Sequence, residues 1–253
     1  MILLMLQKLT LTDFSNEDEK KAIDVAEEEF KIDKMFTYAK GFFHGADMEQ
    51  SLNALTYMRT RHAGQTRKSG ERYIAHPLRM ACTAMALGIK NDDLITTILL
   101  HDVVEDTGVS VSDLPFNDRI RRSVEYMTIT KFEGEENSTT KQRYYDKLLE
   151  DSNALICKGF DRRDNLSTII ELSERAIVKN ILETNIFLLP VMKTAKEKWP
   201  NLSNILYVLR SDIKHMNNIL AHCYKVDQNN KDLLYKLLND PSYCYDVIAT
   251  EIK

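Results

Sequence analysis

The segment at residues 92–107, DDLITTILLHDVVEDT, constrains the fold more than any other part of the chain. Its middle is almost wholly apolar, and a helix without a polar face has to be covered on all sides. Aspartates at its start are typical of a helix N-terminus, and Gly108 is typical of a helix end. We therefore expect a central helix over residues 92–107, surrounded by other helices.

Composition and spacing indicate that the rest of the chain is helical too. Only 8 Gly and 5 Pro occur in 253 residues, of which 43% are hydrophobic and 28% charged, and this balance favours helices. We expect an all-α fold made of an N-terminal helical extension, a compact core and a C-terminal helical extension packed on the core, over residues 1–45, 46–195 and 196–253. Apolar residues at helical spacing predict helices over residues 15–40, 48–62, 77–88, 116–131, 139–152, 154–199 and 201–226.

Charge and cysteine content exclude several classes of protein. The formal net charge of −4 argues against sequence-independent binding of nucleic acid. The four cysteines have neither CxxC spacing nor the density of a disulfide scaffold, so reduced thiols in the cytoplasm are expected. No stretch approaches the roughly 18 apolar residues of a membrane span, and residues 1–11 lack the basic start and the cleavage site of a signal peptide. We expect a cytoplasmic protein with no membrane partner.

The pair His101 and Asp102 lies inside this most apolar helix. An imidazole next to a carboxylate in such surroundings needs a compensating partner, for example a cation. Glu105 and Asp106 follow one turn later, so three carboxylates repel one another unless a positive charge lies among them. The alternative is a helix end whose acids face solvent, and the HD dipeptide alone favours that alternative.

His76 and Asp161 change this balance. With the HD pair they form two imidazoles and two carboxylates, a mixed nitrogen and oxygen set that suits Mn²⁺ or Fe²⁺ with open coordination positions. Such an ion lowers the pKa of bound water and polarises a phosphoryl oxygen, which predicts hydrolysis of a phosphoester or phosphoanhydride. The two acids that follow the HD pair are then the candidates for handling the proton.

Five stretches, in order, resemble the HD-type hydrolase domain of the RelA/SpoT family: HAGQTRKSGERYIAHPLRMA, LLHDVVEDTGVS, TKF, KGFDRRDNLST and ETNIFLLP. They span about residues 55 to 195, and RKSGE-x-YI-x-HP and HDVVEDT are far more specific than HD alone. The resemblance implies an HD-domain helical bundle that acts in the stringent response. Its implied reaction is hydrolysis of the 3′-pyrophosphate of the alarmones guanosine tetra- and pentaphosphate, (p)ppGpp, to GDP or GTP and pyrophosphate. Because no synthetase region follows, we expect a stand-alone hydrolase.

The resemblance also implies roles for individual residues. Mn²⁺ is the usual metal, and its ligands carry over to His76, His101, Asp102 and Asp161. The acids that activate and orient the attacking water carry over to Glu105 and Asp106. The loop that holds the purine and phosphate groups matches Arg67, Lys68 and Ser69. The positions beside the ribose and the 3′-phosphates match Asn165 and Thr168.

Some positions depart from the family pattern. Arg72 stands where the family usually has Pro, and Phe160, Arg163 and Asp164 replace a small, a leucine-like and a histidine residue. Since the last three adjoin the implied metal and sugar, they bear on the substrate more than on the fold. Alternative substrates with the same chemistry are (p)ppApp, the NADPH 2′-phosphate and a pyrophosphorylated tRNA, for an antitoxin-like hydrolase. A further alternative is a non-catalytic protein that binds a purine nucleotide or a partner. A second copy of the chain and a toxin-like synthetase are both open as partners.

Overall fold

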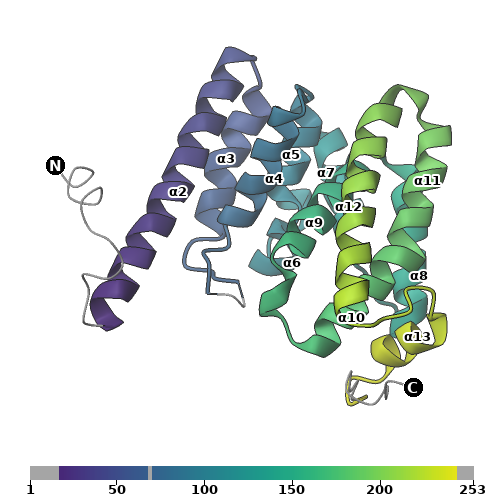
Figure 1. Ribbon diagram of the computed structural model, residues 1–253. Coiled ribbons are helices and arrows are strands. Elements are labelled where there is room, and N and C mark those ends of the chain that lie inside the picture. The colour runs from purple at the N-terminus through teal and green to yellow at the C-terminus, as the bar shows by residue number, and fades with distance from the viewer. Residues whose placement is uncertain (1–16, 68–69, 244–253) are drawn as a thin grey trace.

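The computed structural model describes residues 17–67 and 70–243. Within these residues every regular element is a helix, as Figure 1 shows. An isolated β-bridge joins Thr66 to Arg72 in the loop between two helices. The expected all-α class is confirmed.

Most helices agree with the spans predicted from apolar spacing, but the predicted span over residues 154–199 is broken at residues 168–173. A π-helical turn at Thr184–Leu188 connects two of them. Their bounds are α2 (Glu17–Gly45), α3 (Glu49–Arg61), α4 (Ala75–Ala86), α5 (Asp92–Leu100), α6 (Val103–Thr107), α7 (Asp118–Met127), α8 (Asn137–Lys147), α9 (Ser152–Ser167), α10 (Glu174–Glu183), α11 (Leu189–Lys198), α12 (Ser203–Cys223) and α13 (Lys231–Asn239).

The most apolar segment is central, as predicted, but the prediction of one helix over residues 92–107 is wrong. Residues 94–100 of α5 are all buried, and α5 packs against α3, α4, α7 and α9. The chain turns at His101 and Asp102, and α6 then runs to Gly108, which adopts the left-handed conformation at φ +70°. The HD pair therefore lies at a junction between two helices.

The start of α5 also differs from the expectation. The side chain of Asn91, not an aspartate, caps this helix by accepting a hydrogen bond from the Leu94 amide at 3.0 Å. The Asp92 carboxylate instead accepts the amides of Gln50 and Ser51, at 3.0 and 2.8 Å. Asp92 therefore satisfies free N–H groups in the first turn of α3, a partner far away in sequence.

Helix α9 holds the two halves of the molecule together. It contacts α4, α5 and α7 on one side and α12 on another, and Figure 1 shows it between the α2–α5 layer and the α10–α12 group. The first half of α9 is almost entirely buried. Side chains from α4, α5 and α9 therefore meet in the interior.

The two predicted extensions pack against the middle of the chain. Helix α2 contacts α3 and α4, α12 contacts α9 and α11, and α13 contacts α8 and α10. Residues 1–16 and 244–253, which belong to the predicted extensions, lie outside the described residues, and the domain boundaries stay a prediction. Among the described helices, none combines the length and apolar character needed to cross a membrane.

The position of α9 depends on a buried carboxylate at its N-terminus. The Asp151 side chain accepts hydrogen bonds from the Ala154 amide and the Ser123 hydroxyl, both at 3.0 Å. The Arg119 guanidinium lies 2.7 Å from its other oxygen. This carboxylate therefore caps α9 and ties it to α7.

We predict that Asp151→Ala lowers the free energy of unfolding by about 2–4 kcal/mol. The change removes a cap worth about 1 kcal/mol and leaves buried donors without an acceptor, at about 1–3 kcal/mol. Urea unfolding measures the loss. The control is Asp118→Ala at the start of α7, where the side chain is 92% exposed and a change under about 0.5 kcal/mol is expected. Equal losses in both variants would contradict the assignment.

Candidate metal centre and active site

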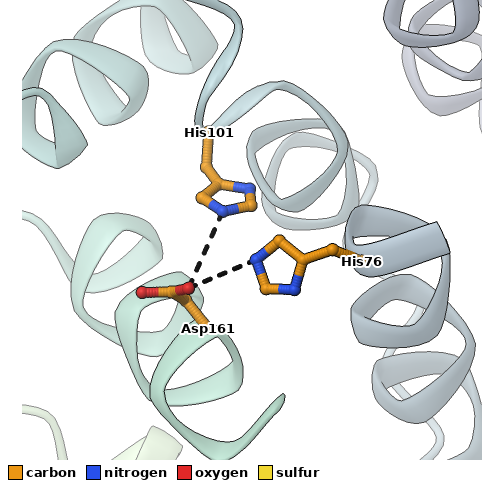
Figure 2. A group of neighbouring side chains, drawn as sticks. All are labelled: His76, His101 and Asp161. Carbon is orange, nitrogen blue, oxygen red and sulfur yellow. Dashed lines mark ion pairs between the residues drawn. The ribbon is translucent and has the colours of Figure 1, made fainter. Parts of the chain in front are cut away.

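Three predicted metal ligands come together in the interior. His76 comes from α4, His101 from the α5–α6 junction and Asp161 from α9, and Figure 2 shows both imidazoles pointing at the Asp161 carboxylate. Oδ1 of Asp161 lies 3.3 Å from Nε2 of His76 and 4.0 Å from Nε2 of His101. All three residues are buried, and one possible ligand atom from each lies within 4.8 Å of the others. We call these residues the His–His–Asp trio.

The fourth predicted ligand, Asp102, lies beside the trio and outside the group of atoms within 4.8 Å of one another. Its Oδ2 is 2.9 Å from Nε2 of His101, and the same oxygen accepts a hydrogen bond from the Tyr73 hydroxyl. Burial raises the pKa of Asp102, but His101 outweighs this effect and holds the pKa well below its ordinary value. The role of Asp102 as a ligand stays a prediction.

Hydrogen bonds hold both imidazoles with Nε2 facing the Asp161 carboxylate. Nδ1 of His101 lies 2.9 Å from the Ile98 carbonyl oxygen, and only a protonated Nδ1 can donate to a carbonyl. Nε2 of His101 is buried without a hydrogen-bond partner, because its contact with Asp102 lacks hydrogen-bond geometry. Nδ1 of His76 lies 2.6 Å from Oδ2 of Asp164. Metal-bound histidines typically donate through the other ring nitrogen in this way, so the trio fits a divalent metal ion.

The electrostatics of the trio favour a positive charge at its centre. Burial lowers the pKa of His101, but Asp102 and Asp161 outweigh it and raise the pKa to about 9. Burial raises the pKa of Asp161, while Lys158 and the two histidines together pull it well below its ordinary value. The ionised carboxylates thus stabilise a proton on the imidazole, and a bound cation would satisfy the same field.

Asp164 is a functional residue that the sequence reasoning missed, since it was interpreted only as a departure from the family pattern. Its carboxylate orients His76 and accepts a fork of two hydrogen bonds from Arg79, at 2.9 and 3.0 Å. Arg79 also pairs with Glu71. Burial raises the pKa of Asp164, but the hydrogen bonds from His76 and Arg79 outweigh it and lower the pKa. Asp164 is therefore held as an anion behind a candidate metal ligand.

A weak signal for these supporting residues was present in the sequence. Asp161 and Asp164 lie three positions apart, as do His76 and Arg79, so each pair shares one face of its helix. Tyr73 lies three residues before His76 and stacks on His62, with ring centroids 4.5 Å apart. Recognising the network would also have required knowing that α4 packs on α9, which no local pattern reveals.

A cavity of about 390 Å³ adjoins the trio. Three of the predicted substrate-binding residues line it, Arg67, Asn165 and Thr168, together with Tyr73. Asn165 donates to Oδ1 of Asp161 at 2.6 Å and accepts from Arg67 at 2.5 Å. The other two predicted substrate contacts, Lys68 and Ser69, lie outside the described residues. We call this space the nucleotide cavity.

The two predicted catalytic acids lie on α6, both exposed. Oε1 of Glu105 accepts the Ile129 amide at 2.6 Å. Partial desolvation of the Glu105 carboxylate, together with Asp102 and Asp106, raises its pKa against the opposing effect of that amide. The backbone carbonyl of Asp106 accepts a hydrogen bond from Gln65. The catalytic roles of both acids stay predictions.

Comparison with known proteins identifies the class. The family model for the HD domain matches residues 54–182, just over half of the chain, and the chain belongs to the HD domain family. An HD domain implies a divalent metal, which the His–His–Asp trio fits.

Curated relatives narrow the family further. A guanosine-3′,5′-bis(diphosphate) 3′-pyrophosphohydrolase of Aquifex aeolicus is 32% identical over 142 residues, which are 54% of this chain and 20% of that protein. A protein of the same name from Spiroplasma citri is 36% identical over 131 residues, or 49% and 17%. The bifunctional (p)ppGpp synthase/hydrolase SpoT of Escherichia coli K12 is 30% identical over 135 residues, or 49% and 19%. The resemblance to RelA/SpoT-family HD hydrolase domains is confirmed, although the chain spans only about a fifth of these relatives.

We predict that Asp164→Asn weakens binding of Mn²⁺ by about tenfold or more, the lower end of the effect of removing an outer partner of a ligating histidine. The amide keeps the shape of the side chain but loses the charge that holds the His76 ring. Isothermal titration of metal-free protein with Mn²⁺ measures the affinity. Asp212→Asn is the matched control, because this carboxylate on α12 pairs only with Arg163 among the described ion pairs. An unchanged affinity in Asp164→Asn would refute the assignment.

Proposed function

We propose that the chain is a Mn²⁺-dependent hydrolase that removes the 3′-pyrophosphate of (p)ppGpp, leaving GDP or GTP. The observation that carries the proposal is the buried His–His–Asp trio joined to the nucleotide cavity through Asn165, which bonds both Asp161 and Arg67. The activities for which the curated relatives are named support this substrate. The fit of mixed nitrogen and oxygen ligands supports Mn²⁺. We also propose that the enzyme works in the cytoplasm.

His76, His101 and Asp161 would hold the ion, with Asp102 beside them. A bound metal ion would lower the pKa of water and polarise a phosphoryl oxygen of the substrate. Glu105 and Asp106 together activate and orient the attacking water and take up its proton. The water oxygen bonds to the phosphorus attached to the ribose O3′, the bond from that phosphorus to O3′ breaks, and O3′ takes up a proton.

The substrate is positioned by the walls of the nucleotide cavity. The flat guanidinium of Arg67 can stack on a purine base, while Asn165 and Thr168 lie where the sugar and 3′-phosphates would sit. The Arg67 guanidinium donates a hydrogen bond to Asn165 and lies 3.4 Å from Asp164. Binding of the base therefore exchanges these contacts for contacts to the nucleotide.

Asp164 also supports a second candidate with the same chemistry. It places a carboxylate against Arg67 where the family pattern has a histidine. The base and sugar of a bound nucleotide would therefore contact a differently charged side of the cavity. (p)ppApp, NADPH or a pyrophosphorylated tRNA end are then the alternative substrates, in an antitoxin-like role opposite a synthetase partner. A non-catalytic nucleotide-binding protein is the remaining alternative.

A substrate panel separates these candidates. Purified protein with Mn²⁺ is assayed against ppGpp, ppApp and NADPH, and released pyrophosphate and orthophosphate are measured separately. We expect pyrophosphate from ppGpp at the highest rate. Faster turnover of ppApp or release of orthophosphate from NADPH would favour the second candidate, and no release from any of them would contradict a hydrolase.

Substitutions in the site test the assigned roles. His101→Ala and Asp161→Ala are expected to lose both Mn²⁺ binding and activity, whereas the exposed His215→Ala is the control that keeps both. Asp106→Asn is expected to keep metal and nucleotide binding while kcat falls about 10²–10⁴-fold, the usual contribution of acid–base catalysis. Full activity in Asp106→Asn would remove this residue from the mechanism.

A further inference from the structure

A second cavity, of about 330 Å³, lies between α8, α10 and the chain around α13. It shares no lining residue with the nucleotide cavity, and α10 contributes Asn180 to the first and Lys179 to the second. Four cations line it, Lys131, Lys141, Arg175 and Lys179, and the described residues contribute no acid to the lining. We call it the cationic cavity.

The buried carboxylate of Glu183 lies next to this cavity and interacts with two cations at once. Oε2 of Glu183 lies 3.6 Å from Lys141 and 3.5 Å from the buried Arg162. Arg175 donates hydrogen bonds to the backbone carbonyl oxygens of Leu237 and Tyr243, at 2.7 and 3.1 Å, and to that of Asp240. Those carbonyl partners are neutral, and the nearby charge of Arg175 helps to lower the pKa of the exposed Asp240 carboxyl.

The pKa of Lys179 is affected by the positive charges around this cavity. Burial lowers its pKa, and Lys141, Arg162 and Arg175 push the pKa in the same direction against Glu183. No carboxylate lies within ion-pair distance of Lys179 among the described ion pairs. A half-buried ammonium in such a field is stabilised by an anion brought into the cavity.

Residues of α13 and of the segment after it form one wall of the cationic cavity. The Asn137 side chain at the start of α8 donates to the Leu238 carbonyl at 2.8 Å, and the Ser138 amide donates to the Asn239 side chain at 2.8 Å. Together with Arg175, these bonds dock α13 onto both α8 and α10. These bonds therefore hold the cationic side chains around one partly open cavity.

We propose that the cationic cavity binds a phosphate or pyrophosphate group, separately from the metal centre. Its volume is at the lower end of the roughly 300–1,000 Å³ of small-molecule sites, and lysine and arginine give charge-assisted hydrogen bonds to phosphate oxygens. Ile129 connects the cationic cavity to the candidate active site, because it lines the cavity and its backbone amide donates a hydrogen bond to Glu105. This site does not rest on the proposed reaction.

Isothermal titration of the metal-free full chain with sodium pyrophosphate tests the proposal. The wild-type chain is expected to bind, and Lys141→Gln combined with Lys179→Gln is expected to weaken binding at least tenfold, because two charge-assisted contacts are lost. The matched control is Lys196→Gln combined with Lys214→Gln. Those two lysines line another hollow, of about 310 Å³, and their loss is expected to change the affinity less than twofold.

Thermal melts establish that each variant is folded. If the double variant does not fold, Lys179→Gln alone carries the test, because no described ion pair involves this lysine, and its affinity is expected to fall at least threefold. Three results would overturn the proposal: no binding by the wild-type chain, equal losses in the cavity and control variants, or a loss confined to Arg67→Gln, which would place the anion in the nucleotide cavity.

Discussion

The convergence of two imidazoles on one oxygen of Asp161 is the interaction on which the rest of the structure depends. Burying His76, His101 and Asp161 together is costly unless their polar atoms are satisfied. The atoms that face away from the centre are satisfied, by the Ile98 carbonyl, by Asp164 and by Lys158, which lies 2.6 Å from Asp161. The Nε2 atoms of both imidazoles face Oδ1 of Asp161, which also accepts a hydrogen bond from Asn165, and Nε2 of His101 faces Asp102 as well. A cation would complete this arrangement.

This requirement links the fold to the site. The three side chains come from α4, the α5–α6 junction and α9, so they meet only if all of these elements pack correctly. Asp151 secures α9 through its cap, and Asp92 secures α3 against α5. From the trio, Asn165 extends the network to Arg67 and the nucleotide cavity. The trio, Arg67 and the packing of these helices therefore form one connected network.

The sequence predicted the parts of the fold that depend on local pattern. Helical spacing gave the positions of α2, α3 and α4, and the burial of α5, to within a few residues. The break at His101 and Asp102 was missed, because no glycine or proline marks it. The role of Asp92 was missed because its partners on α3 are 41 and 42 positions away.

The same limit applies to the site. Three of the four ligands predicted from motif positions lie together. The contact of Asn165 with Asp161 was not predicted, because Asn165 was assigned only to the substrate. Asp164 was misjudged, because its meaning lies in contacts with His76 and Arg79 on another helix. The cationic cavity could not be foreseen either, since its lysines and arginine are brought together only when α13 docks on α8 and α10.

X-ray diffraction from crystals of the protein grown with Mn²⁺, with data collected at the manganese absorption edge, tests the account most directly. The account predicts a strong anomalous peak bounded by Nε2 of His76, Nε2 of His101 and a carboxylate oxygen of Asp161. The opposite result is an anomalous peak for Mn²⁺ elsewhere in the protein and none at the trio. That outcome would show that the buried trio is a structural polar cluster and not a metal centre.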